Sequence, residues 1–493
     1  MENLIQLRPG DPNDANRDYL PEAIKGSQMV VNENGNNSQP LPEGLQEFTL
    51  AITEDGLTDT WYEYVPKTYD PAKKTPLVFS MHGGLMTGWG QCIYTSWTYI
   101  ADREGFICVF PSANSRRFWQ IMCEEEKKEE LMAPNGAGIF MNPFPDDIRE
   151  NHDANLVLAL IQRMKEKYNI DESRIYMQGM SLGNAMTHMM SKYYAHKFAA
   201  MAGSAGPARS TLLFNKEGKP DHRSLPVGAW QTRMELDGVP PACDEDPVDL
   251  VVRNREYWLT INECDSMPKI SIFGENNMAF YTGRHGNYVF RDVKNRDHGQ
   301  TFDDAELVWD YLFSGASRLA DGTISHEPTK LPKENDACAV AAVAGCSNAW
   351  VNGDIRSLGG EAFLWQKLKY HGLDGGHIVR GEYLMLPVSF LAELDGAAVT
   401  WGADNRTATV ATSDGMRLQF AQGSIGAVVN NRIESMYCEA VLRDNQLYIS
   451  AEWYLRRVRK LQVSRCTDAM YATDHDANLS IHMSRLLRDL LKG

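Results

Sequence analysis

The sequence of 493 residues has no hydrophobic run long enough to cross a membrane. Its longest apolar stretch, 337–345, is about half of the eighteen or more residues that a membrane-spanning helix needs. The first ten residues also lack the basic start and apolar run of a signal peptide. We therefore expect no membrane span.

Positive charge is scarce as well. The chain has 49 Lys and Arg residues against 65 Asp and Glu residues, a formal net charge of -16. A field of this sign repels phosphate backbones and anionic membrane surfaces. We therefore expect no nucleic-acid partner.

Cysteine pairs with the spacing of metal ligands are absent too. The nine cysteines include no C-x-x-C pair of the kind that holds structural zinc. An odd number leaves at least one thiol outside any disulfide, so the cysteines leave the cellular compartment open. No metal site is expected.

The remaining composition is that of a folded, water-soluble protein, with 43% hydrophobic and 23% charged residues. At about one to two hundred residues per domain, the length implies two or three domains. Residues 1–45 are rich in Asn, Gly, Pro and Asp, which is typical of an arm. Residues 46–320 alternate short apolar strands with amphipathic helices, so we expect an α/β fold with a mostly parallel, doubly wound sheet. Residues 115–150 interrupt this pattern with an acidic patch and aromatic loop sequence, and we interpret them as a candidate cap insertion.

The composition changes after this first domain. We expect a linker at 321–346, a smaller β-rich α+β domain at 347–465 and a C-terminal helical tail at 466–493. Two segments of the smaller domain, 383–394 and 447–458, resemble one another. Each has the pattern of a short strand running into a short amphipathic helix, which indicates an internal duplication.

The strongest chemical signal is Gly179-x-Ser181-x-Gly183, between a predicted strand and a predicted helix. A nucleophile at such a sharp turn has crowded neighbours, and side chains in place of the glycines would clash with the adjacent strand and helix. The motif therefore predicts Ser181 as a nucleophile. The alternative is a tight turn with an incidental serine.

A second loop offers backbone donors. Met81-His-Gly-Gly-Leu follows a predicted strand about a hundred residues before the serine. Preorganised N–H groups best meet a developing oxyanion, so we assign this role to the amides of Gly84 and Leu182. The alternative is a flexible loop after a strand.

A general base is expected downstream of the serine. His298 follows a late strand and precedes the last amphipathic helix of the first domain, so it is the preferred candidate for the base. His285, in a polar turn, is the competitor. An ordinary surface histidine is the alternative for both.

The acid of a Ser-His-acid triad is expected between the serine and the histidine in chain order. Asp237, in a loop after a predicted strand at 225–231, is preferred, with Glu235 and Glu275 as alternatives. Its task would be to hold His298 in the right tautomer and to stabilise the imidazolium. A solvated loop carboxylate is the alternative in each case.

Residues 60 to about 315 resemble the polyhydroxybutyrate depolymerase-like and feruloyl esterase-like α/β-hydrolases. The matching segments are Pro76–Gly84, Tyr168–Met186, Trp258–Cys264, and His298-Gly with the helix around Trp309. The family carries its acid in a Gly-x-x-Asp turn ahead of an Asn-x-Cys element, which favours Asp237, although Met234 stands here in place of the turn glycine. Gln300-Thr-Phe after the histidine also departs from the aromatic sequence usual in the family.

The C-terminal region, about 347–462, looks like the copper amine oxidase N-terminal-like domain of bacterial surface proteins. The resemblance lies in the segment from Tyr383 and in its repeat near Leu447. Such domains are not the copper-binding catalytic part, so no copper is expected, and the spacing of His371 and His377 is interpreted as incidental.

Together these observations predict a serine carboxylic-ester hydrolase that acts through an acyl-enzyme and needs no cofactor. Hydroxycinnamoyl, acetyl and polyester-type esters remain open as small-molecule or polymeric substrates. We expect residues 1 to about 320 to carry the chemistry, and the C-terminal domain to serve polysaccharide or cell-surface attachment. Attachment implies an extracellular or cell-surface location, with a cytoplasmic one as the alternative. The competing function is a non-catalytic surface binding protein on a hydrolase scaffold.

Overall fold

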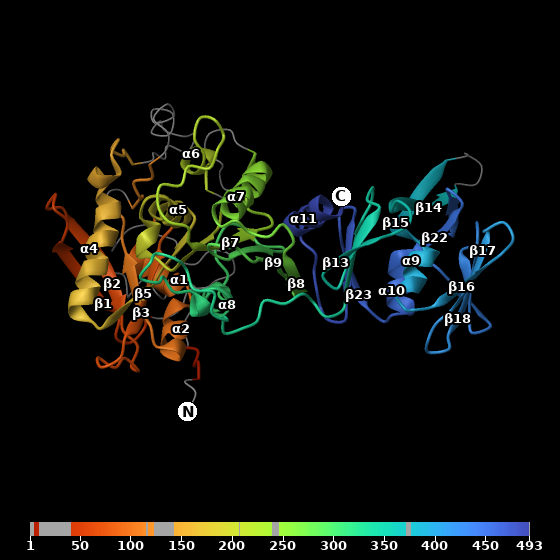
Figure 1. Ribbon diagram of the computed structural model, residues 1–493, viewed down its shortest axis with the longest axis horizontal. Helices are drawn as coiled ribbons and strands as arrows, with labels where there is room; N and C mark the ends of the chain where they lie inside the picture. The colour runs from red at the N-terminus through yellow and green to blue at the C-terminus, as the bar shows by residue number, and fades with distance from the viewer. Residues whose placement is uncertain are drawn as a thin grey trace. The chain divides into compact units, whose positions relative to one another are not determined.

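The computed structural model describes residues 4–8, 41–114, 117–122, 142–206, 208–238, 246–370 and 376–492. The chain divides into two compact units (Figure 1). The first consists of Met1–Pro268 and Ala279–Lys333, and the second of Lys269–Met278 and Glu334–Gly493. Most of the expected arm, and much of the candidate cap, lie outside the described residues.

The first unit is built on a mostly parallel sheet, as predicted. The strand order is β1-β2-β4-β3-β5-β6-β7-β10, followed by β9. All pairs from β4 to β10 are parallel, whereas β1 and β2 are antiparallel to their neighbours. The bounds are β1 (Gln46–Ala51), β2 (Thr58–Tyr64), β3 (Thr75–Met81), β4 (Ile107–Pro111), β5 (Ile170–Met180), β6 (Ala200–Ser204), β7 (Gly228–Met234), β9 (Asn276–Tyr281) and β10 (Tyr288–Val293).

Helices alternate with these strands. They are α1 (Gly88–Tyr94), α2 (Trp97–Glu104), α4 (His152–Lys167), α5 (Leu182–Tyr194), α6 (Ser210–Leu213), α7 (Pro247–Ile261) and α8 (Asp304–Tyr311), with 3-10 turns η4 (Ile148–Glu150), η5 (Ala195–Lys197) and η6 (Phe313–Gly315). Asn151 caps the N-terminus of α4, and its side chain accepts a hydrogen bond from the Ala154 amide. Helix α4 buries Leu156, Leu160 and Met164, which lie on one helical face. Strand β3 is buried along its whole length, as a central parallel strand requires.

Three strands differ from the sequence expectation, and one of them is β9, which the sequence pattern did not predict. Strand β7 begins at Gly228, three residues after the expected start at Leu225, because Pro226 has no N–H to donate to a sheet. Strand β10 was not predicted, because Arg291 and Asp292 interrupt its apolar pattern, yet both side chains are fully buried.

The second unit contains three antiparallel sheets and the strand β8 (Lys269–Phe273). The first sheet is β13 (Asp354–Ser357), β12 (Asn348–Val351), β11 (Ala339–Val343), β24 (Ala469–Thr473) and β23 (Gln462–Cys466). The second is β14 (Phe363–Tyr370), β15 (His377–Pro387), β22 (Gln446–Ser450) and β21 (Val441–Arg443). The third is β16 (Ala398–Trp401), β17 (Thr407–Ala411), β18 (Arg417–Ala421), β19 (Gly426–Val429) and β20 (Arg432–Ser435).

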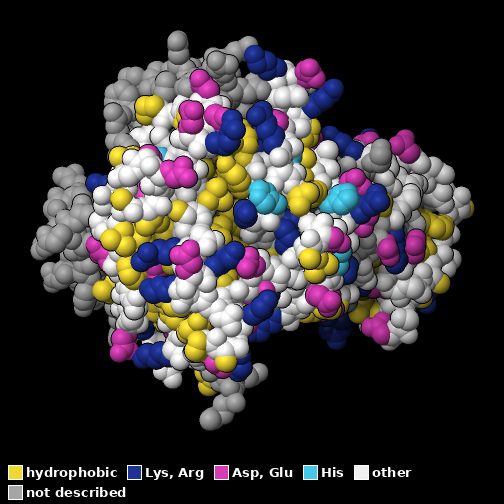
Figure 2. Space-filling model, turned by 60° about the vertical axis from the view of Figure 1, so that its left-hand side comes forward, with side chains coloured by type: hydrophobic (Ala, Val, Ile, Leu, Met, Phe, Trp, Pro, Cys, Tyr) yellow, Lys and Arg dark blue, Asp and Glu magenta, His cyan; other side chains and the backbone are white. Residues whose placement is uncertain are grey.

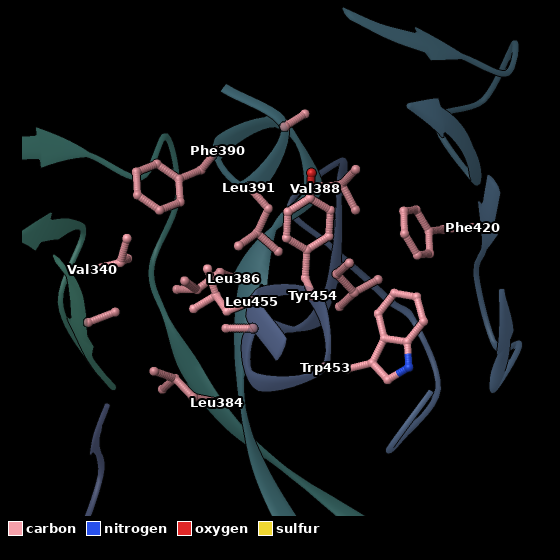
Figure 3. Close-up of a cluster of buried hydrophobic side chains, with 14 of the residues drawn as sticks. Val340, Leu384, Leu386, Val388, Phe390, Leu391, Phe420, Trp453, Tyr454 and Leu455 are labelled. Atoms are coloured by element: carbon pink, nitrogen blue, oxygen red, sulfur yellow. The ribbon is translucent and has the colours of Figure 1, made fainter. Parts of the chain in front are cut away.

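The two similar segments both form a strand that runs directly into a helix, as expected. Strand β15 leads into α9 (Val388–Glu393), and β22 leads into α10 (Ala451–Arg457). The two strands pair antiparallel, with Leu386 opposite Ile449. Side chains from both strand–helix units point into one apolar core (Figure 3). Burial of this shared apolar core explains why the β15–α9 segment and the β22–α10 segment occur together.

The boundaries of the second unit differ from the expected ones. The expected linker, 321–346, contains β11, whose five residues are buried and pair with β24. The expected helical tail, 466–493, contains β24 before its helix α11 (Ile481–Leu491). Short runs of small residues such as Ala339–Val343 look like linker in sequence, but sheet pairing buries them.

Charges of both signs lie interspersed on the face of the molecule drawn in Figure 2. Within the described ranges, no helix is long and apolar enough to span a bilayer. Nor do the described His, Cys, Asp and Glu side chains form a group of three or more that could hold a metal ion.

Candidate active site

Ser181 stands on a strained turn between β5 and α5. Its backbone has φ 55° and ψ -117°, a conformation that residues with a Cβ rarely adopt. A Cβ on Gly179 would lie 2.0 Å from the Gly183 carbonyl oxygen, and one on Gly183 would lie 2.2 Å from the Met81 carbonyl oxygen. Both glycines are therefore needed to hold the serine in this turn, because a side chain at either position would clash with the neighbouring backbone.

Three of the predicted side chains meet at the carboxyl ends of parallel strands. His298 Nε2 lies 2.9 Å from Ser181 Oγ, and His298 Nδ1 lies 3.0 Å from Asp237 Oδ1. Ser181 follows β5, Asp237 follows β7 and His298 follows β10. The Asp237 side chain is fully buried, and that of His298 is 16% exposed. This is the geometry of a nucleophile, a base and an orienting acid.

The alternative residues have other partners. His285 Nε2 lies 3.1 Å from Glu263 Oε1, and both side chains are partly exposed. The Glu235 carboxylate accepts a hydrogen bond of 2.9 Å from the Asn295 amide. Glu275 lies in the turn between β8 and β9 and belongs to the second unit.

A buried glutamine network anchors the loop that carries His298. Gln178 Nε2 donates to Gln300 Oε1 at 3.0 Å, and the backbone N–H of Gln300 donates to the Tyr94 hydroxyl at 2.9 Å. The side-chain oxygen Oε1 of Gln178 in turn accepts from Ser80 Oγ and Trp97 Nε1, at 2.8 and 3.0 Å. Sequence analysis did not identify this network. A glutamine directly before the motif glycine, at the end of the run Ile175-Tyr-Met, was the available signal.

Arg291 holds the far end of the same loop. This fully buried side chain donates to Thr301, Asp303 and Asp304 at 3.0, 3.0 and 2.7 Å. Burial raises the pKa of Asp304, whereas Arg291 opposes that shift. The segment that directly follows His298 is thus held to β5 through Gln300 and to β10 through Arg291, which limits how far the imidazole can move.

His82 shapes the loop after β3. Its Nδ1 donates to the Gly83 carbonyl at 2.6 Å, and its Nε2 accepts from the Ala113 amide at 2.9 Å. Burial lowers the pKa of His82 to about 4, so the ring is neutral and can make both bonds. Trp119 Nε1 donates to the His82 carbonyl at 2.8 Å. These bonds fix the loop, in contrast to the alternative of a flexible segment.

This loop passes directly beside the nucleophile. A Cβ on Gly83 would lie 3.3 Å from Ser181 Cβ, and one on Gly84 would lie 3.0 Å from the Phe118 ring. Among the described residues, neither the Gly84 amide nor the Leu182 amide donates to a protein acceptor. Leu182 is also the first residue of α5, where unpaired N–H groups favour negative charge.

Ser181 stands on a strained turn between a strand of the mostly parallel sheet and the helix that follows it. It is hydrogen-bonded to His298, which in turn faces the buried Asp237. The fold is that of an α/β hydrolase, and the three side chains have the geometry expected of a serine nucleophile with its base and acid.

Several known proteins with sequences similar to this chain are esterases. The chain is 30% identical over 277 residues to a bifunctional acetylxylan esterase/xylanase of Neocallimastix patriciarum, covering 55% of this chain and 35% of that protein. It is 23% identical over 318 residues to acetylxylan esterase A of Aspergillus oryzae, covering 63% and 84%. Feruloyl esterase B of Neurospora crassa is 28% identical over 34% of this chain and 51% of its own. The chain therefore spans about a third of the first of these relatives and most of the second.

Among solved structures, an acetyl xylan esterase from Aspergillus awamori is 17% identical, with a TM-score of 0.39 over 54% of this chain and 98% of that chain. A ferulic acid esterase from Anaeromyces mucronatus is 15% identical, with a TM-score of 0.32 over 55% and 93%. Residues 372–463 match the copper amine oxidase N-terminal domain. The resemblance of the sequence to these esterases and to that domain is confirmed.

Proposed function

We propose that the protein is a serine carboxylic-ester hydrolase with Ser181, His298 and Asp237 as its triad. One observation carries the proposal: Ser181 is held in a strained turn with its Oγ 2.9 Å from His298 Nε2, while buried Asp237 lies 3.0 Å from His298 Nδ1. The similarity to acetylxylan and feruloyl esterases supports the same reaction class.

The chemistry follows from this arrangement. His298 Nε2 takes the Ser181 proton while Oγ attacks the ester carbonyl carbon. The amides of Gly84 and Leu182 stabilise the resulting oxyanion. When the intermediate collapses, His298 returns the proton to the leaving alcohol, and an acyl-serine remains. Water, activated by the same imidazole, then releases the acid and restores Ser181.

Acetyl, hydroxycinnamoyl and polyester-type esters all suit this mechanism. We favour acetyl or hydroxycinnamoyl esters on a polysaccharide, because the similar proteins are acetylxylan and feruloyl esterases by name. A panel of p-nitrophenyl acetate, methyl ferulate, acetylated xylan and a polyhydroxybutyrate oligomer, assayed on one preparation, tests this preference. A rate on the polyester far above the other rates would contradict it.

A non-catalytic binding protein on the same scaffold is disfavoured by the intact geometry of Ser181, His298 and Asp237. Hydrolysis of p-nitrophenyl acetate that is lost in Ser181→Ala, with an unchanged circular dichroism spectrum, supports the enzyme. Hydrolysis that is absent from the wild-type chain across the whole panel contradicts it.

We also propose that the second unit attaches the enzyme to an insoluble polysaccharide or a cell surface, which places the protein outside the cell. Half-buried aromatic rings lie along one face of β14 and β15. Trp365 and Tyr383 are opposite one another in the ladder, and Phe363 and Tyr437 are their neighbours. The variant Trp365→Ala/Tyr383→Ala should bind acetylated xylan less while keeping its rate on p-nitrophenyl acetate. Unchanged binding to xylan would contradict this role.

A further inference from the structure

The guanidinium of Arg233 lies against the proposed triad acid. Arg233 is on β7, four residues before Asp237, and its side chain is only 4% exposed. Its Nη1 donates to Asp237 Oδ2 at 3.1 Å, and its Nη2 donates to the Asp237 carbonyl oxygen. The other carboxylate oxygen, Oδ1, faces His298 Nδ1. Arg233 therefore binds both the side chain and the backbone of the turn that presents the acid.

We propose that Arg233 is a positioning residue of this active site, which directs Asp237 Oδ1 at His298 and keeps the buried carboxylate ionised. The inference rests on the proposed function, since it assigns a role relative to the triad. A carboxylate buried without a cation becomes easier to protonate, and a protonated acid stabilises an imidazolium poorly. The planar guanidinium fork also fixes the direction of its acceptors, which a single point charge does not.

Other charged groups surround this contact. Asp292 lies opposite Arg233 in the ladder of β7 and β10 and is fully buried. The Asp297 carboxylate accepts a 2.7 Å hydrogen bond from the His298 amide. On the adjoining turn, Lys294 Nζ lies 3.9 Å from Glu235 Oε1. Arg233 thus supplies positive charge between two buried carboxylates, one of which faces the histidine.

The test compares the pH profiles of two variants of the full chain on p-nitrophenyl acetate. Arg233→Met removes a positive charge beside the Asp237–His298 pair, so the pair binds its proton more readily, whichever residue holds it. The acid limb of kcat/KM should move to higher pH by about one unit, and kcat should fall about 100-fold. Arg233→Lys keeps the charge but loses the fork. Its acid limb should stay in place while kcat falls about 10-fold with KM unchanged.

Arg318 provides the matched control in the same unit. Its buried guanidinium donates to the carbonyls of Phe198, Gly322 and Pro226, at 2.7, 2.6 and 2.9 Å. Arg318→Met should lower the melting temperature but leave the acid limb and kcat unchanged. The proposal would be overturned if Arg233→Met kept both the wild-type kcat and the wild-type acid limb of the kcat/KM pH profile. If that variant fails to fold, Arg233→Lys decides, because a wild-type kcat there would equally overturn it.

Asp237→Asn separates this inference from the proposed function. If Asp237→Asn is fully active, the triad assignment itself fails. If Asp237→Asn is impaired while Arg233→Met is not, only the role of Arg233 fails. In the Asp237→Asn background, Arg233→Met should cost less than about threefold in kcat, because residues that act through one another are not additive.

Discussion

The two units place their left-handed backbone conformations at different kinds of residue. In the first unit, Leu85, Ser181 and Ala205 all have positive φ, and all three lie on loops that follow strands of the parallel sheet. In the second unit, such conformations fall mainly on hairpin-turn residues such as Asn430 and Asn445, for which they cost little. At Leu85, Ser181 and Ala205 the strain lies on loops at the carboxyl edge of the sheet that carries the proposed site, although Glu263 after α7 also has positive φ; in the second unit it serves chain reversal.

The placement of buried ion pairs beside the proposed site is a second feature of the first unit. The core of the second unit is a cluster of apolar side chains from its two strand–helix segments and from other strands, such as Val340 of β11 and Phe420 of β18 (Figure 3). The first unit buries the pairs Arg233–Asp237 and Arg291–Asp304, which hold the acid and the histidine loop. Such pairs are costly to desolvate and add little net stability. Their position next to the triad indicates that they serve geometry.

The largest expected difference in kcat is between substitutions of two histidines of the first unit, His298 and His285. His298→Ala should reduce kcat by about 10⁴-fold, because His298 Nε2 is the atom that can take the Ser181 proton. His285→Ala should leave kcat nearly unchanged, since His285 pairs with Glu263. Initial rates on p-nitrophenyl acetate measure both, and equal losses would contradict the assignment of the base.

A carboxylate from each unit gives the next comparison. Asp237→Asn should lower kcat by about 10² to 10⁴-fold with the fold retained, because an amide can hold the imidazole in the wrong tautomer. Glu275→Gln, in the second unit, should change kcat less than about twofold. A larger loss in Glu275→Gln would show that the acid has been misassigned.

Gly183 of the first unit and Gly426 of the second differ in how closely other atoms pack around them. Gly183→Ala would place a Cβ 2.2 Å from the Met81 carbonyl oxygen, whereas the nearest atom to a Cβ on Gly426 of β19 is at 3.5 Å. Urea unfolding should show a loss of about 2–3 kcal/mol for Gly183→Ala and less than about 0.5 kcal/mol for Gly426→Ala. Similar losses would mean that the turn around Ser181 is less crowded than described.

The pH dependence of stability should come mainly from His152. Its ring nitrogens face Asp59 and Asp55 at 2.8 and 2.6 Å, and the hydrogen bond to Asp59, with that to Asp55, raises the pKa of His152 to about 9. Because the folded-state pKa exceeds the unfolded one, the stabilisation is complete below about pH 6.5 and is lost as pH rises to about 9.

The His152 side chain is buried, but Asp55 is 44% exposed, and solvent screening of that partner reduces the contribution of His152 to about 1–2 kcal/mol. His152→Gln should remove this part of the pH dependence of urea unfolding. His475→Gln, at a half-exposed histidine of the second unit, should remove less. The reverse order would contradict the His152 assignment.

The smallest expected effect concerns strain itself. Ser181→Gly should stabilise the chain by about 1 kcal/mol while abolishing activity, because glycine adopts the Ser181 conformation without a Cβ clash. Asn430→Gly in the β19–β20 turn should change stability by less than about 0.5 kcal/mol, since asparagine already tolerates positive φ there. Thermal unfolding of both variants measures the difference, and a destabilised Ser181→Gly would contradict the link between strain and function.

The nucleophile could be predicted from sequence because its requirements are local. Ser181 and its two glycines lie within five residues, between a strand and a helix whose patterns are regular. The choice among Asp237, Glu235 and Glu275 could not be made from spacing alone, because Asp237 meets His298 only when β7 and β10 pair. Its position after a predicted strand and the family resemblance both favoured Asp237, and the structure has it 3.0 Å from the histidine.

Buried polar residues account for most of what sequence analysis missed. Arg291 made β10 look like a loop, and the bonds of Gln178 and Arg233 reach across the sheet or a turn in ways that no periodic pattern encodes. Sheet pairing also buried β11, a stretch that resembled a linker. Local propensity therefore predicted element types well, whereas tertiary contacts decided the polar scaffold of the site and the limits of the second unit.

The triad can be tested without knowing the natural ester, by reaction with an alkyl fluorophosphonate. Such a reagent phosphonylates a serine only where a base removes its proton, so the full-length protein should gain one adduct, which peptide mass spectrometry should locate on Ser181. His298→Ala should react at least about 100-fold more slowly. Absence of an adduct, an adduct at another residue, or equal labelling of His298→Ala would contradict a Ser181–His298–Asp237 hydrolase.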